Sequence, residues 1–558
     1  MQNQQQSDRL SWGDTVFLHL EREGMPLNVA SICVFEGQVS FEDCLQFIES
    51  KLPLLPRYLK RVVSAPFGLG LPSWEYDPEF ELTRHVRDVV LKHGTDSELK
   101  AMAGKLFGTV MDRQHPLWDL TLVRGLKGNR TALIIRLHHC LADGIAGVGI
   151  MNVLLDANPE ATPLPKKKKR LKFRVPPPRD PLASLTTGFV ETYSDFVKRI
   201  LSALTDLLSM AERAAANGGD LNTTEFLGLL PEISAFTERL RFNVLYRGPQ
   251  KFATAEIPLA DIKAIRHACG TSVNDVILAV VTATIRRYCE LHGDRVKGKL
   301  LRLMVPVNLR GSTTASDMGN RISLVPVTIP LDIRPPLKLL AAAHKRAEFL
   351  IHVHAAELVS LAGGFIGMFP TSVQGMIGPL ISQLPVSAFN LVCTNVPGPQ
   401  FPLYLLGHKM VHCYPYVPVG GEMAVNCAIL TYNGMAYFGF SGDVHAAPDL
   451  RRLEDLLQES FTELRDAAGI KAPQKKRARR KRAGSTGARS PIRQAKPAPA
   501  ALVEAVASRI QQQKVPELAP VIAAQNTVSF KKHPGAPPVP ILSQPDLFRT
   551  VNIPHEVK

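Results

Sequence analysis

The sequence predicts an α/β protein built from two halves. In both halves, short apolar segments typical of buried strands alternate with segments in which apolar residues recur at helical spacing. Between the halves, residues 161–181 are rich in proline and in basic residues, a composition typical of a linker. With 558 residues, the chain is also long enough to form two or more hydrophobic cores.

The first half is organised around an apolar strand at residues 132–135, which we expect to be buried on both faces. Before it we expect a strand that ends at Phe35, an amphipathic helix at residues 41–52 that Pro53 terminates, and a strand at residues 119–124. After it, a series of glycines fits a helix start that packs closely against its surroundings.

The second half is expected to begin near Lys251. Its predicted strands are residues 252–257, 303–309, 322–329, 423–432 and 435–441, and its predicted helices are residues 259–269, 271–290 and 450–468. The dipeptide Asn433-Gly434 between the last two strands is the signal of a type I′ hairpin turn. At the start of the long helix, Ser272 or Asn274 would serve as the N-terminal cap, and Asp275 suits the positive end of the helix dipole.

The charge and the cysteines limit the classes of function. The net charge of +16 is concentrated in residues 166–174 and 471–500, so the rest of the chain is close to neutral. The eight cysteines form no Cys-x-x-Cys pair and lie mostly in apolar surroundings, which predicts buried reduced thiols rather than disulfides or a zinc site. We expect neither a signal peptide nor a membrane-spanning helix.

Residues 131–150, TALIIRLHHCLADGIAGVGI, carry the main functional signal, because the strand ends in His138, His139, Asp143 and Gly144. Neighbouring strand residues point to opposite faces, so only one imidazole can face a given cavity. That imidazole could act as a general base, since an ordinary histidine pKa near ~6.5 suits proton abstraction. Alternatively, both histidines are inert polar residues at a strand end, or Cys140 is a thiol nucleophile.

The pattern His-His-x-x-x-Asp-Gly resembles the active-site motif of the bacterial wax ester synthase/acyl-CoA:diacylglycerol acyltransferase family. That motif is shared with the wider chloramphenicol acetyltransferase-like superfamily, which includes peptide-synthetase condensation domains. Further strings resemble the narrower family in the same order, and together they cover roughly residues 10–469. They are Asp14, Phe17 and Leu18, then Pro116-Leu117-Trp118, Asn274-Asp275-Val276, Pro306-Val307-Asn308-Leu309-Arg310, Gly319-Asn320 and Asn395-Val396-Pro397-Gly398-Pro399.

The resemblance implies two chloramphenicol acetyltransferase-like halves with mixed sheets around a central tunnel. Residues 1–160 would form the first half, 161–250 a basic linker with crossover helices, 251–469 the second half, and 470–558 a largely disordered basic tail.

The resemblance also implies roles for individual residues. His139 would be the general base, while His138 and Asp143 shape its loop and Gly144 allows a tight exit from it. Asn274 would border the acyl channel and is a candidate oxyanion donor. Pro116 and Trp118 would lie at the substrate channel, although a large aromatic residue is commonly a packed core anchor.

The implied reaction moves a long acyl group from acyl-CoA to diacylglycerol or a long-chain alcohol, with neither cofactor nor metal. The uncharged residues 358–407 would form a channel wall, a membrane-dipping face or simply core helices, and the basic segments could attract an anionic membrane or a lipid droplet. We therefore expect a cytoplasmic protein that associates peripherally with the inner membrane or with droplets.

Three alternatives stay open at this point. A related acyltransferase could use a different acceptor, or a non-catalytic protein could coat lipid surfaces. The basic tail could bind nucleic acid, although nothing in the folded part supports that reading.

Overall fold

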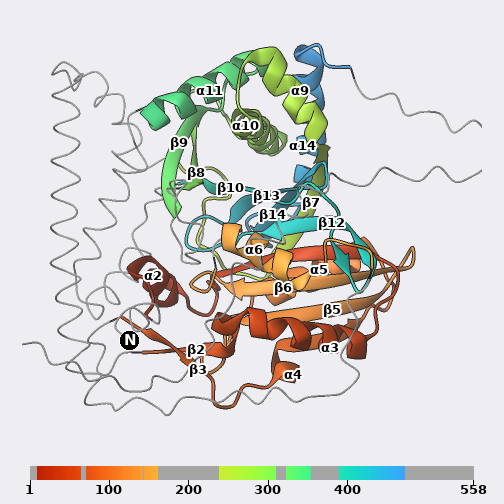
Figure 1. Cartoon of the computed structure of the whole chain (residues 1–558). Coiled ribbons are helices and arrows are strands. Elements are labelled where there is room, and N and C mark those ends of the chain that lie inside the picture. Colours follow the sequence, from red (N-terminus) through yellow and green to blue (C-terminus); the bar gives the residue numbers. More distant parts are fainter. Residues whose placement is uncertain are drawn as a thin grey trace, which may run out of the picture. The chain divides into compact units, whose positions relative to one another are not determined.

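A computed structural model describes residues 9–64, 71–142, 144–160, 238–308, 322–352 and 389–471 (Figure 1). Its described part is built on two six-stranded sheets, one for each half, and a small two-stranded sheet formed by β2 and β3. Both large sheets are mixed, because β4 and β5 in the first and β8, β10 and β13 in the second pair in parallel whereas their other pairs are antiparallel. The predicted α/β architecture of two halves is confirmed.

The first half supplies β1, β6, β5 and β4 as successive neighbours in its sheet. Its elements are α2 (Trp12–Leu20), β1 (Asn28–Glu36), α3 (Phe41–Lys51), β2 (Lys60–Val63), β3 (Ser73–Tyr76), α4 (Leu82–His85), β4 (Val86–Val90), α5 (Asp96–Phe107), β5 (Trp118–Leu126), β6 (Arg130–His138) and α6 (Gly144–Leu154). Helix α3 starts where the Ser40 hydroxyl accepts a hydrogen bond from the Asp43 amide, and it gives way to a short 3₁₀ turn at the Pro53 position. The predicted strands and helix are confirmed.

The second half supplies the sheet β7-β14-β13-β10-β8-β9. Its elements are β7 (Gln250–Pro258), α9 (Leu259–Cys269), α10 (Val273–Leu291), β8 (Leu300–Asn308), β9 (Ile322–Pro330), α11 (Pro336–His352), β10 (Leu391–Pro397), β11 (Tyr404–Leu405), β12 (His408–Tyr416), β13 (Val425–Tyr432), β14 (Met435–Asp443) and α14 (Arg452–Ala467). Helices α9, α11 and α14 surround α10, and one hydrophobic core joins these four helices to the sheet (Figure 1).

Local signals explain two features of the second half. Asn433 and Gly434 both have positive φ, 46° and 82°, as a type I′ turn between β13 and β14 requires. Helix α10 begins with a capping box in which the Ser272 hydroxyl and the Asp275 carboxylate each accept a backbone hydrogen bond. Ser272 is therefore the cap, and Asn274 is not.

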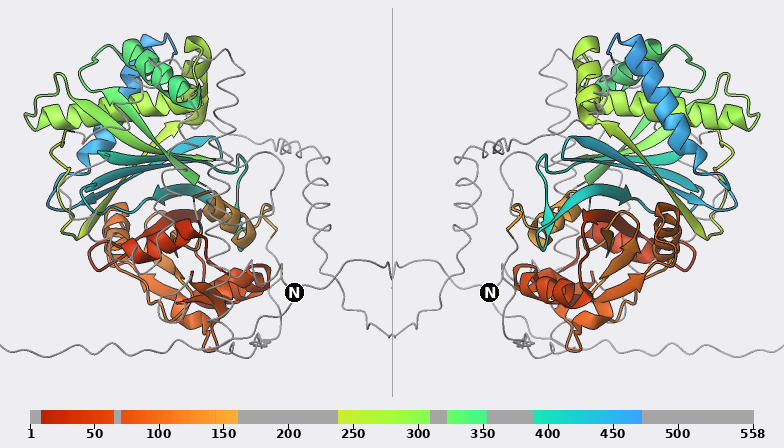
Figure 2. Two further views of the ribbon diagram at one scale, coloured as in Figure 1. Left: turned by 90° about the vertical axis from the view of Figure 1, so that its left-hand side faces the viewer. Right: turned by 90° about the vertical axis from the view of Figure 1, so that its right-hand side faces the viewer.

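Strand β12 crosses from the second half into the sheet of the first. After β10 the chain forms β11 and β12, and β12 pairs antiparallel with β1 before the chain returns to β13 (Figure 2). Phe107, Phe252 and Tyr416 form a shared aromatic cluster, with ring centroids of Phe107 and Tyr416 4.1 Å apart. The two halves are thus joined by a strand exchange as well as by packing, which the sequence division at residue 251 did not anticipate.

Strand β6 lies in the middle of the first sheet and is buried over nearly its whole length. Ala132, Leu133, Ile134 and Ile135 are each at most 5% exposed, which confirms a strand buried on both faces. Arg136 is the one charged side chain in the buried stretch of this strand, and it forms an ion pair with the buried Asp119 on β5. The end of β6 is therefore held rigidly.

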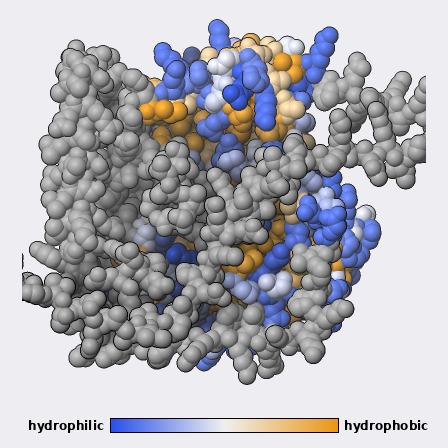
Figure 3. Space-filling model, in the orientation of Figure 1, coloured by the Kyte–Doolittle hydropathy of each residue, from blue (hydrophilic) through white to orange (hydrophobic). Residues whose placement is uncertain are grey.

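Several predictions concern residues that lie outside the described ranges. They include the crossover helices, expected at 185–213 and at 224–239 (of which only 238 and 239 are described), Arg310, Gly319-Asn320, most of the uncharged residues 358–407, and nearly all of both basic segments. On the coloured parts of the face shown in Figure 3, hydrophobic residues are in view both near the centre and in the upper part, between hydrophilic ones. No single helix within the described ranges is long and apolar enough to span a membrane. Helices α9 and α10, bent by 104° at their junction, pass that test only as a pair.

Candidate active site

The two histidines stand where β6 ends between the starts of β5 and β1. The backbone N–H of His138 donates to the carbonyl of Leu117 (3.0 Å), and that of His139 donates to the carbonyl of Leu27 (2.9 Å). His138 is fully buried, whereas His139 is partly exposed. The expectation that only one of the two imidazoles faces a given cavity stays a prediction.

The ring of His138 is fixed by a backbone hydrogen bond. Its Nδ1 accepts a hydrogen bond from the N–H of Cys140 (3.1 Å), so Nδ1 carries no proton. The ring proton is therefore on Nε2, which lies 3.3 Å from Oε1 of Glu21. His138 is a positioned side chain inside the protein, and its ring does not reach solvent.

Glu21 is the buried carboxylate behind the pair, directly after α2. Its side chain is 2% exposed; Oε1 accepts the N–H of Leu27 (3.2 Å), and Oε2 lies 3.2 Å from Nη2 of Arg113. Burial by itself would raise the pKa of this carboxyl, but the hydrogen bonds from His138, Leu27 and Arg113 hold the pKa below its ordinary value. Glu21 is thus a buried anion.

Sequence reasoning missed Glu21. No spacing rule connects it with the histidines, and an acidic residue between Leu20 and Arg22 at a helix end is usually a surface residue. The signal that could have found it is its place just before the turn that leads into the central strand β1.

His139 lies flat against Phe17 of α2, with ring centroids 3.9 Å apart and an interplanar angle of 14°. Burial is the main cause that lowers the pKa of His139 to about 4, and the neighbouring His138 lowers it further, against a hydrogen bond with its own backbone. At neutral pH, and down to about pH 4, the ring therefore stays uncharged. An uncharged imidazole in a water-poor site has a lone pair that can accept a proton.

Cys140 does not have the properties of a nucleophile. Its side chain is 1% exposed, and burial is the main cause that raises the pKa of the thiol well above its usual range. The residue contributes its backbone N–H to His138 instead. All eight cysteines are free and seven of them are buried, which confirms the predicted reduced thiols.

The Pro116-Leu117-Trp118 turn lies beside the histidines, because Leu117 accepts the N–H of His138. Pro116 is buried, and Trp118 packs inside the first half, where its Nε1–H donates to the carbonyl of Tyr58 (2.7 Å) and its ring stacks on His85 at 4.6 Å. These contacts are those of a core anchor. A role of Pro116 and Trp118 in substrate binding stays a prediction.

The other predicted site residues are only partly placed. Asp143 lies outside the described residues, and Gly144 begins α6. Asn274 lies on the first turn of α10 and is partly exposed, and its neighbour Asp275 is engaged by the cap and by His344, 2.8 Å away. Their roles at the site, like that of Asn274 toward an oxyanion, stay predictions. Among the described residues, no cluster of three or more His, Cys, Asp or Glu side chains could hold a metal ion.

Comparison with known proteins shows which family the chain belongs to. Residues 10–277 match the wax ester synthase/diacylglycerol acyltransferase catalytic domain, and residues 318–465 match the C-terminal domain of the same family. The chain belongs to this family. It is an acyl-CoA-dependent acyltransferase, as the resemblance in the sequence implied.

Relatives of the wax ester synthase/diacylglycerol acyltransferase family agree with this assignment. A probable diacylglycerol O-acyltransferase of Mycobacterium tuberculosis is 26% identical over 449 residues, covering 78% of this chain and 91% of the relative. A second one from that species is 26% identical over 472 residues, covering 83% of this chain and all of the relative.

Solved structures confirm the fold. The wax ester synthase/diacylglycerol acyltransferase of Marinobacter aquaeolei VT8 matches with a TM-score of 0.57 at 24% identity, over 83% of this chain and all of that one. The first condensation domain of the calcium-dependent antibiotic synthetase matches with a TM-score of 0.52 at 15% identity, over 82% of this chain and 95% of that one.

Proposed function

We propose that this acyltransferase moves a long-chain acyl group from acyl-CoA to the free hydroxyl of diacylglycerol, with a long-chain alcohol as the second candidate acceptor. The observation that carries the proposal is His139, an uncharged imidazole at the end of a rigid buried strand, with its ring stacked on Phe17. The preference for diacylglycerol rests on the curated relatives, which carry that activity in their names.

In the proposed reaction, the unprotonated nitrogen of His139 accepts the hydroxyl proton while the alcohol oxygen attacks the thioester carbonyl. The tetrahedral intermediate then collapses, the carbon–sulfur bond breaks, and the imidazolium returns the proton to the leaving thiolate of CoA. No acyl-enzyme is needed, because the thioester is already activated and only the alcohol requires help. The low pKa of His139 suits this return step, because a weakly basic imidazolium readily gives up its proton.

The test is release of CoA from palmitoyl-CoA with dioleoylglycerol or hexadecanol as acceptor. His139→Ala is expected to lower kcat by about 10²- to 10⁴-fold, the usual contribution of a general base. The matched control is His267→Ala, which removes the same ring from an exposed position on α9 and should leave kcat unchanged. A folded wild-type protein that releases no CoA with either acceptor would contradict the proposed acceptors.

We also propose peripheral association with an anionic membrane or lipid droplet on the cytoplasmic side. Its support is the sequence: residues 166–174 contain seven basic residues and residues 471–500 contain eleven without an acidic one. Each basic residue near an anionic surface contributes about 1 kcal/mol before screening. Co-sedimentation with phosphatidylglycerol vesicles should be strong at low salt and weak at high salt. Equal binding to neutral phosphatidylcholine vesicles would contradict it.

A further inference from the structure

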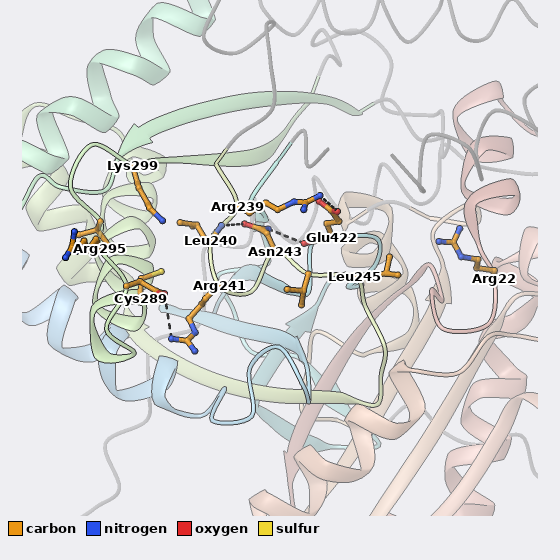
Figure 4. Close-up of a pocket in the computed structure, with 13 residues that line it drawn as sticks. Arg22, Arg239, Leu240, Arg241, Asn243, Leu245, Cys289, Arg295, Lys299 and Glu422 are labelled. Atoms are coloured by element: carbon orange, nitrogen blue, oxygen red, sulfur yellow. Dashed lines mark hydrogen bonds and ion pairs between the residues drawn. The ribbon is translucent and has the colours of Figure 1, made fainter. Parts of the chain in front are cut away.

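A cavity of about 760 Å³ is lined by residues 239–245, which precede β7, by the end of α10 with the loop that follows it, by Glu422 and by Arg22 of the first half (Figure 4). Five of its lining side chains are basic and two are acidic. The basic ones are Arg22, Arg239, Arg241, Arg295 and Lys299, and the acidic ones are Asp294 and Glu422. A concave site with this excess of positive charge favours an anionic ligand.

The two carboxylates neutralise only part of that charge. Glu422 pairs with Arg239 at 2.6 Å, and Asp294 lies 3.7 Å from Arg241. Arg295 and Lys299 have no carboxylate within ion-pair distance in the described part of the chain. Each therefore has hydrogen-bond donors available for a ligand.

The backbone around these two cations is well defined. They belong to the connection between α10 and β8, where the Lys299 N–H donates to the carbonyl of Val296 (3.1 Å) and the Lys299 carbonyl accepts the N–H of Leu331 (2.9 Å). Val296 is buried beside them. The backbone positions from which these two side chains extend are thus set by the fold.

At its other end the cavity is lined by Arg22 of the first half, whereas His138, His139 and Glu21 do not line it. Arg22 follows Glu21, whose carboxylate faces His138, and Arg22 forms a tight turn with Met25 through two backbone hydrogen bonds. Met25 packs on Gly420, since a Cβ added there would lie 2.6 Å from the Met25 side chain. A long ligand could therefore place its anionic end among Arg295 and Lys299 and extend toward the turn behind the histidines.

The cavity also has an apolar wall formed by Leu240, Val244 and Leu245. Its volume falls within the range of about 300–1,000 Å³ usual for pockets that hold drug-sized or cofactor-sized ligands. A phosphorylated nucleoside needs this combination of an apolar surface for its base and cations for its phosphates.

We infer that this cavity binds an organic phosphate group, and that its source is the phosphorylated nucleotide portion of acyl-CoA, with Arg295 and Lys299 as phosphate contacts. The inference rests on the proposed function, because that reaction supplies acyl-CoA as the ligand. A phospholipid headgroup carries the same phosphate chemistry, so the experiment must separate the two sources.

The first arm measures binding of free CoA by calorimetry, without turnover. The variant Arg295→Glu/Lys299→Glu should weaken the Kd for CoA at least tenfold, because a hydrogen bond to a charged group is commonly worth more than a factor of ten. The matched control, Lys263→Glu/Lys345→Glu, changes two exposed cations on α9 and α11 that do not line the cavity. It should bind CoA like the wild type, and equal weakening in both variants would overturn the assignment.

The second arm uses turnover to show that the contact is to phosphate. With palmitoyl-CoA, the cavity variant should have a raised KM and an unchanged kcat. With palmitoyl-pantetheine, which has no phosphate, variant and wild type should have the same KM. A raised KM for both thioesters would overturn the phosphate contact.

The third arm tests the alternative source with vesicles of phosphatidylcholine and phosphatidylglycerol. If the cavity variant loses vesicle binding while its Kd for CoA is unchanged, the cavity is a headgroup site and the CoA assignment is wrong. Wild-type protein that binds CoA in the first arm but transfers no acyl group would refute the proposed function alone. The binding arm therefore stands independently of catalysis.

Discussion

Removing the negative charge of Glu21 should disturb both histidines at once. The carboxylate faces Nε2 of His138 and accepts the N–H of Leu27, and the carbonyl of that same Leu27 accepts the N–H of His139. The ring of His138 and the backbone of His139 therefore depend on one buried side chain. We predict that Glu21→Gln lowers both stability and kcat.

The size of the stability loss follows from the three donors around the carboxylate. A glutamine has only one acceptor oxygen, and its NH₂ group donates rather than accepts. In either orientation of the amide, the NH₂ group therefore faces another donor, from His138 or from Arg113, and one hydrogen bond is lost. Arg113 is 47% exposed and can turn to water, so its loss contributes little. The buried donors of Leu27 and His138 cannot do so, and one hydrogen bond to a charged group is worth about 1.5–3 kcal/mol. We expect Glu21→Gln to cost about 2 kcal/mol and Glu21→Ala about 3–5 kcal/mol.

Urea unfolding and steady-state kinetics measure the two effects. The midpoint should fall without a change in the m value, and kcat should fall by about 10²-fold, as a displacement near 1 Å at a reacting group can produce. Glu81→Gln is the control, since that side chain is 60% exposed and its loss should stay within about 0.5 kcal/mol. If Glu21→Gln retains the wild-type midpoint and kcat, the carboxylate does not position the histidines.

Four further predictions concern His139, Trp118 and the cysteines. Because the pKa of His139 is lowered to about 4, the acid limb of kcat/KM should lie near pH 4 rather than near ~6.5. When the pH is lowered, this imidazole takes up a proton in the unfolded chain near pH ~6.5, well before it does so in the folded protein. The free energy of unfolding should therefore fall by up to about 3 kcal/mol between pH ~6.5 and pH 4 and recover when the pH is raised. A denaturation series at several pH values measures this. Trp118→Phe removes the hydrogen bond to the carbonyl of Tyr58 and should lower the free energy of unfolding by about 1 kcal/mol. If the variant keeps the wild-type acyl-chain preference, Trp118 is a core anchor; if the preference changes, Trp118 is a channel residue. Ellman's reagent should label at most the partly exposed Cys269 in the native protein, and all eight thiols after unfolding.

Much of the fold could be predicted because its signals are local. Helix α9 agrees with its predicted bounds, and the Asn433-Gly434 turn requires positive φ at two successive residues, which few other pairs tolerate. The burial of β6 followed from its continuous apolar run. His138 is the last residue of β6 and is buried, whereas His139 lies in the turn after the strand and is partly exposed, so the expected alternation along a strand does not account for the difference.

The features that could not be predicted depend on contacts between distant parts of the chain. The pairing of β12 with β1 brings Cys413 opposite Cys33, and no local pattern in residues 408–416 assigns that strand to the other half's sheet. Glu21 is a similar case, because its burial depends on Arg113 and on the end of β6. Periodicity reports which face of an element is apolar, but it does not report which charged groups the fold will bring together.

The division of work between the two histidines follows from these long-range contacts. A general base must present a free lone pair, yet its ring must not rotate away from the reacting hydroxyl. His138 could not meet the first condition, because its Nδ1 is occupied by the N–H of Cys140 and its Nε2 faces Glu21. Phe17 restrains the ring of His139 by stacking, and burial keeps that ring uncharged, which favours His139 as the proposed base. An exchange of function between the two positions would therefore require a new partner for Glu21, and the His138 that remains in His139→Ala should not take over the role of the base.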